Sequence, residues 1–149
     1  MTSLTLRAGL MAALLTVPGI ASAQSQLDRF EALSERLTQL TLEGVALQVP
    51  ALAGNLPSVE WDRRMRRAGR CALRRYEDAV GEAGVAAMLT EFERAVQTAQ
   101  PGDILAGNFN AGVPQGLTAN DVSSINTACG LTELQTEQLA GVLQALQAQ

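Results

Sequence analysis

Residues 61–80 read WDRRMRRAGRCALRRYEDAV, and this stretch decides how the rest of the chain is interpreted. It holds seven of the eleven arginines, the single tryptophan, the single tyrosine and one of the two cysteines. At about 100° per residue, its apolar and small side chains form one stripe, with arginines opposite. The stripe comprises Trp61, Met65, Ala68, Ala72, Tyr76 and Ala79; the arginines opposite are Arg63, Arg66, Arg67, Arg70 and Arg74. The pattern predicts a helix with a buried aromatic side and a basic outer side.

The flanking residues predict where this central helix begins and ends. Ser58 is the expected N-cap, and Glu60 and Asp62 follow in the first turn, where the helix dipole favours acids. Gly81 and Gly84 lower the helix propensity, so we expect the helix to break there. Prolines and a glycine in residues 49–57 predict a connecting loop before it.

Helical periodicity also occurs on both sides of the central stretch. Residues 25–48 begin with a candidate N-cap at Ser25 and continue with one apolar face. That face comprises Leu27, Phe30, Leu33, Leu37, Leu40 and Leu47. Residues 85–99 repeat the same spacing and predict a third helix.

The C-terminal part predicts a long loop followed by two short helices. Residues 101–116 are rich in glycine and proline and should form a surface connection. Thr118 and Asp121 make a capping box at the start of a fourth helix, and Gly130 suits its left-handed end. Thr132 repeats the capping signature before a fifth amphipathic segment. The chain therefore predicts an all-α fold, a small bundle of four to five amphipathic helices with one long-range disulfide.

The first 23 residues have the features of a cleaved secretory signal peptide. Arg7 precedes an apolar run over residues 8–20, and Ala-Ser-Ala at 21–23 forms a small-residue cleavage site. The apolar run is too short to span a bilayer. We therefore expect a single helical domain at residues 24–149 that is exported and has no transmembrane segment after processing. Absent lysine and abundant alanine, glycine and arginine indicate a GC-rich genome, which favours a bacterial periplasm over another secreted location.

An exported protein with two cysteines most simply forms one disulfide, here between Cys71 and Cys129. The alternative is a free thiol at Cys71. Nearby Arg64, Arg70 and Arg75 would then favour the thiolate and make the sulfur reactive.

The residue types present restrict the possible chemistry. The chain contains no histidine, which removes a Ser-His-Asp triad and imidazole metal ligation. Nucleotide-binding glycine motifs and a CxxC pair are also missing from the sequence. We therefore predict a protein that is not an enzyme and has neither metal nor cofactor. An enzyme that works through carboxylates or arginine is the remaining catalytic alternative.

The arginines of residues 61–80 are the strongest candidate for a functional surface. Pairs at i, i+4 spacing would neutralise some of them, namely Glu60–Arg64, Asp62–Arg66 and Arg74–Asp78. Arg63, Arg67, Arg70 and Arg75 would remain as candidate contacts for an anion or a partner. The alternative is that these arginines have no binding role, and either form a solvated face or pair with acids of the protein's own C-terminal half.

The function predicted from this surface is a non-catalytic interaction or an envelope-associated role. The partner would be an acidic protein or an anionic lipid surface. Nucleic acid is not expected, because acids outnumber bases in the chain. The alternative is a helical binding module for a small anionic or amphiphilic ligand, which requires several arginines to converge on a concavity.

Overall fold

The computed structural model describes residues 18–147, which are all-α. The helices are α1 (Pro18–Gln48), the short 3-10 helix η1 (Pro50–Leu52), α2 (Arg63–Thr98), α3 (Pro101–Leu105), α4 (Ala119–Ala128) and α5 (Leu131–Gln147). No strand occurs within this range. The predicted small helical bundle is confirmed. Residues 1–17, which hold most of the predicted signal peptide, lie outside the described part of the chain.

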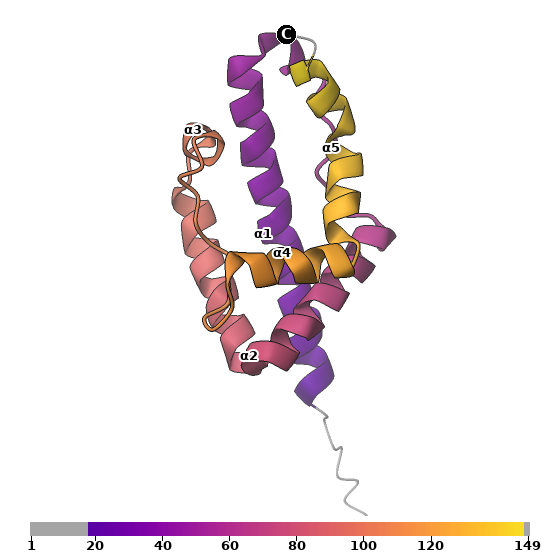
Figure 1. Ribbon diagram of the computed structural model, residues 1–149, viewed down its shortest axis with the longest axis vertical. Coiled ribbons are helices and arrows are strands. Elements are labelled where there is room, and N and C mark those ends of the chain that lie inside the picture. The colour runs from indigo at the N-terminus through magenta and orange to yellow at the C-terminus, as the bar shows by residue number, and fades with distance from the viewer. Residues whose placement is uncertain (1–17, 148–149) are drawn as a thin grey trace, which may run out of the picture.

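The helices are arranged around α1, which runs along the long axis of the molecule (Figure 1). The first half of α2 crosses α1, and its second half turns sharply and runs back along the other side. α4 lies across the front of α1 and α2. α5 runs from the end of α4 toward the end of the molecule that lies away from the bend in α2 (Figure 1). There Val142 of α5 packs in one cluster with Leu42 and Val45 of α1.

The main core lies between α1 and both halves of α2. Its residues include Leu27, Phe30, Trp61, Met65, Ala72, Tyr76, Val85, Leu89 and Phe92. The Trp61 ring meets the Phe30 ring edge to face, with centroids 5.7 Å apart. A methyl group at Gly69 would lie 2.8 Å from Cη2 of Trp61, so the absent side chain makes room for the indole. The inward aromatic stripe is confirmed except at Ala79, which is exposed just before the bend of α2.

α2 begins later than predicted, because Asp62 is the N-cap in place of Ser58. The Asp62 Oδ1 accepts from the backbone N–H groups two and three residues on, both at 2.8 Å. The backbone N–H of Trp61 donates to Glu35 Oε1 of α1 at 2.7 Å. This hydrogen bond holds Trp61 against α1, so the first helical turn of α2 begins only after Trp61.

The predicted break in the central helix takes the form of a bend at Gly81. Its φ of +77° and ψ of 165° lie outside the helical region, and glycine adopts them without a Cβ clash. The apolar residues after the bend are buried as the spacing of 85–99 predicts. The predicted loop over 101–116 is only partly irregular, because its first five residues form α3.

Two expectations for the first helix are wrong. α1 begins at Pro18 and not at Ser25, because proline suits a first helical turn and the residues after it tolerate a helix. The predicted cleavage site therefore falls inside α1. Leu47 is 75% exposed, and Leu42 and Val45 are buried in its place. The C-terminal end of α1 faces α3 and α5, so its buried side is rotated from the one that faces α2.

The ends of α4 agree with the sequence. The backbone N–H of Thr118 donates to Asp121 Oδ2 at 2.8 Å, and Asp121 N–H donates to Thr118 Oγ1 at 3.2 Å. Hydrogen bonds from the Thr118 hydroxyl and backbone lower the pKa of Asp121. Gly130 has a φ of +76° between α4 and α5. α5 then begins at Leu131, one residue before the predicted cap at Thr132.

Candidate functional site

Four arginines of α2 form a line on the side that faces away from the core, which we call the arginine ridge: Arg63, Arg67, Arg70 and Arg74. Their spacing of four, three and four residues keeps them within one narrow sector of the helix. All four are exposed, whereas the residues on the opposite side of the same turns are buried. The burial of that opposite side fixes the direction in which the ridge points.

Arg66 lies on the edge of α2 that faces α1, and its charge is neutralised there. Its Nη2 lies 2.8 Å from Asp28 Oδ1, and its Nη1 pairs with Glu31 Oε2. Hydrogen bonds to Asp28 and then to Glu31 raise the pKa of the Arg66 guanidinium. This pair of acids joins α1 to α2 beside the core.

Arg64 lies on the other edge of α2, next to α5. Its Nη1 and Nη2 donate to the two carboxylate oxygens of Glu137 at 3.1 and 3.4 Å. Both side chains are about 60% exposed, at 62% and 60%, so this pair contributes little to stability.

The predicted pairs within α2 are replaced by these contacts between helices. Arg64 and Arg66 reach α5 and α1, and Asp62 caps the helix. Within the described residues, the ridge arginines have neither an ion pair nor a side-chain hydrogen bond. The reason is geometric, since Arg64 and Arg66 lie where α5 and α1 offer an acid, and the ridge points away from both of these helices.

The ridge differs by one residue from the set predicted by sequence. Arg63, Arg67 and Arg70 belong to it, but Arg75 lies on the flank that carries Cys71. Arg74 takes its place, because the predicted pair with Asp78 is not formed among the described side chains. Arg70 and Arg74 are seven and eleven residues from Arg63, and these separations return to the same side of a helix. The sequence therefore contained the signal that Arg74 belongs to the ridge.

The predicted disulfide is confirmed. Cys71 of α2 is bonded to Cys129 at the end of α4, and their Cα atoms are 5.7 Å apart. The described chain has no free cysteine. The alternative of a reactive thiol at Cys71 therefore does not apply to the oxidised protein.

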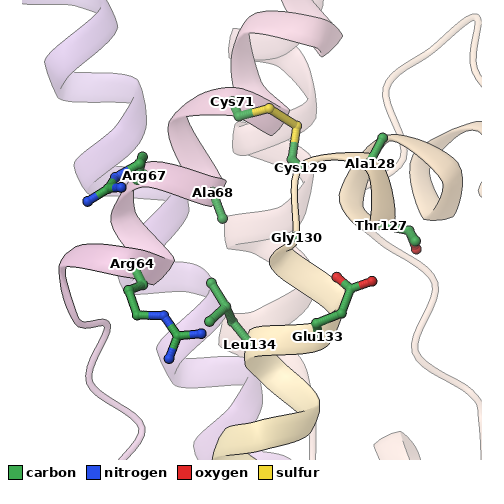
Figure 2. Close-up of a pocket in the computed structure, with 10 residues that line it drawn as sticks. All are labelled: Arg64, Arg67, Ala68, Cys71, Thr127, Ala128, Cys129, Gly130, Glu133 and Leu134. Atoms are coloured by element: carbon green, nitrogen blue, oxygen red, sulfur yellow. A yellow bond between two sulfur atoms is a disulfide. The ribbon is translucent and has the colours of Figure 1, made fainter.

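An open depression of about 620 Å³ lies beside the disulfide, between α2 and the start of α5 (Figure 2). Arg64, Arg67, Ala68, Glu133 and Leu134 contribute to its lining. Figure 2 shows that the Arg67 guanidinium points away from the disulfide. The Arg64 guanidinium donates to Glu137 of α5. The depression also contains a carboxylate. The arginines therefore do not converge here as the ligand-pocket alternative requires.

A second depression, of about 540 Å³, lies along α2 on the other side of Cys71. Arg74, Arg75, Glu77 and Asp78 line it, so two positive charges face two negative ones. This arrangement also provides no net site for an anion.

The described residues offer little for other kinds of chemistry. Among residues 18–147, no cluster of three or more cysteines or acids is arranged to hold a metal ion. None of the helices in the same range is both long and apolar enough to cross a membrane. The site and the fold together define a small, disulfide-bonded, all-α protein with a basic ridge. Comparison with protein-family models, curated proteins and solved structures finds no match.

Proposed function

We propose that this protein is exported and acts without catalysis, by holding an anionic partner on the arginine ridge of α2. The observation that carries the proposal is the division among the α2 arginines. Arg64 and Arg66, at the edges, are paired with acids of neighbouring helices, whereas the four ridge arginines, like Arg75 on the Cys71 flank, have no ion pair among the described residues.

Like charges on successive turns of a helix repel one another, so an unpaired ridge costs folding free energy. A partner with negative charge would offset this repulsion. Arginine also suits such a role, because its planar guanidinium donates two parallel hydrogen bonds to a carboxylate or a phosphate. The remaining polar features of α2, its cap and its edge pairs, already have structural explanations.

Export is supported by the signal-like residues 1–23 and by the disulfide between Cys71 and Cys129, since disulfides persist in oxidising compartments. Intact-mass measurement of protein recovered from the periplasm tests this part. We expect a chain that begins at Gln24 and has lost two hydrogen atoms, because oxidation of two thiols to a disulfide removes two protons and two electrons. A full-length chain confined to the cytoplasm contradicts export.

Charge reversal tests the ridge itself. Changing three ridge arginines to glutamate should abolish retention of the folded protein on immobilised polyglutamate at low salt. The substitutions are Arg63→Glu, Arg67→Glu and Arg70→Glu. Unchanged retention contradicts the proposal and leaves the ridge as a solvated face. Circular dichroism and tryptophan fluorescence of the variant verify that the helices and the Trp61 environment are retained.

A further inference from the structure

We infer that the anion held by the ridge is the phosphate layer of an anionic lipid surface. This inference rests on the proposed function and names the chemistry of its partner. The shape of the ridge, the side chains that surround it and the distribution of charge over the rest of the protein support it.

The ridge is a line and not a hollow. Its eleven-residue span from Arg63 to Arg74 corresponds to roughly 16 Å of helix. The four arginines share one exposed side of α2; Arg63 and Arg70 line neither depression beside the disulfide, and Arg67 and Arg74 each contribute to a different one, so no depression gathers the four. A row of this kind can meet several headgroups of a flat surface at once, whereas a single small anion would engage only one or two arginines.

The surroundings of the ridge disfavour a protein partner. Stable protein interfaces have an apolar core with aromatic anchors inside a polar rim. The aromatic residues of this region, Trp61 and Tyr76, are 7% and 1% exposed. Across residues 25–142, the exposed large hydrophobic residue is Leu47, at the far end of α1. A basic segment adsorbs to anionic lipid through charge alone and needs no apolar anchor.

The remaining charge gives the protein one orientation on such a surface. The net charge of the chain is −4, and residues 95–149 contain four acids and no base. An anionic surface therefore attracts the ridge and repels the C-terminal part, which keeps attachment reversible and sensitive to salt. Glu77 and Asp78 follow Arg74 by three and four residues, about one helical turn, and limit the length of the ridge.

The test is co-sedimentation of the purified, disulfide-bonded protein with lipid vesicles. Vesicles that contain phosphatidylglycerol should bind the protein at low salt, vesicles of pure phosphatidylcholine should not, and high salt should release it. Each arginine near an anionic surface increases partitioning by roughly fivefold. Arg67→Gln with Arg70→Gln should therefore weaken binding by about 30-fold.

Arg36→Gln with Arg94→Gln is the matched control, since it gives the same net charge from two other exposed arginines. The pair of Arg36 with Glu43 is 3.6 Å long and exposed, so its loss should leave the fold intact. We expect the control to weaken vesicle binding by less than about twofold.

Each outcome decides one of the claims. Equal losses in the two double variants overturn the ridge as the lipid contact, because net charge alone would explain them. Retention on polyglutamate without binding to phosphatidylglycerol vesicles overturns the lipid inference and leaves the proposed function, with an acidic protein as the partner. Failure to bind either probe overturns both.

Discussion

The disulfide should supply a large part of the stability of this small domain. Cys71 and Cys129 are 58 residues apart in the sequence. Closing a loop of that length removes roughly 14 cal/mol/K of entropy from the unfolded chain, or about 4 kcal/mol at room temperature. Cys71→Ala with Cys129→Ala should lower the free energy of unfolding by that amount, which is a large share of the 5–15 kcal/mol typical of a domain.

The structure also indicates where the loss will be concentrated. α4 has no fully buried residue, and only half-buried Val122 and Ile125 pack its apolar side against the core, so the disulfide and a polar contact supply much of what holds it against α2. The main polar contact is the hydrogen bond from the Tyr76 hydroxyl to Asn126 Oδ1, at 2.6 Å. Backbone amides of α4 and the start of α5 should therefore exchange with solvent much faster in the double variant, while those of the α1–α2 core change less.

Urea denaturation followed by the fluorescence of Trp61, with hydrogen exchange on the same samples, measures both effects. Wild-type protein in the presence of a dithiol reductant is the control and should give the stability of the double variant. A loss of less than about 1 kcal/mol would refute the chain-entropy argument. An equal increase in exchange across all helices would refute the account of how α4 is held.

Three further predictions follow from individual side chains. Burial raises the pKa of Tyr76 to about 12, so absorbance titration of this single tyrosine should show ionisation near that pH when folded and near 10 in denaturant. The contribution of the Tyr76 hydroxyl to stability is complete below its unfolded pKa and is lost as the pH rises from about 10 to about 12. Ionisation of Tyr76 near pH 10 in the folded protein would contradict its burial. Gly69→Ala forces a methyl group against the buried indole and should cost about 1–3 kcal/mol in urea unfolding, whereas Gly141→Ala, in open space on α5, should gain about 0.5–1 kcal/mol. Equal effects at the two glycines would show that the indole does not rest on Gly69. The lowered pKa of Asp121 means that its contribution to the α4 cap is complete above the unfolded pKa and is lost as the pH falls through the lower folded value. Asp121→Asn should remove this acid dependence of α4, as measured by NMR, and an unchanged pH profile would exclude the capping box as its source.

Features set by neighbouring residues were predictable from the sequence. The capping box of Thr118 and Asp121, the left-handed Gly130 and the interruption at Gly81 each depend on a few positions along the chain. The same is true of the inward stripe of α2, which follows from helical periodicity. The cysteine pair was predictable because two cysteines in an oxidising compartment allow one intramolecular bond.

Features that depend on how helices are placed relative to one another were not predictable in this way. Arg66 was assigned to Asp62 on its own helix, but Asp28 and Glu31 lie closer because α1 crosses at that edge. Asp62 was then available as the N-cap. Asp62 and not Ser58 is the N-cap because the backbone N–H of Trp61 is bound by Glu35 of α1. No local sequence pattern reveals this contact between helices.

The candidate site shows the same division. The sequence identified three of the four ridge arginines and placed them opposite the buried stripe. The predicted set contains Arg75 in place of Arg74, because the i, i+4 spacing predicts that Arg74 pairs with Asp78. The edge arginines were distinguished from the ridge only when acids on α1 and α5 were located around α2.

The most direct test of the ridge is an NMR titration that resolves the Nε–Hε signals of the arginines. Vesicle-sized assemblies broaden such signals, so small phosphatidylglycerol nanodiscs or soluble polyglutamate are the appropriate anions. We predict that the signals of Arg63, Arg67, Arg70 and Arg74 shift together as either anion is added, and that the signal of Arg66 stays in place. Shifts spread evenly over all arginines, or none on the ridge, would contradict the claim that this line of α2 is where the protein holds its partner.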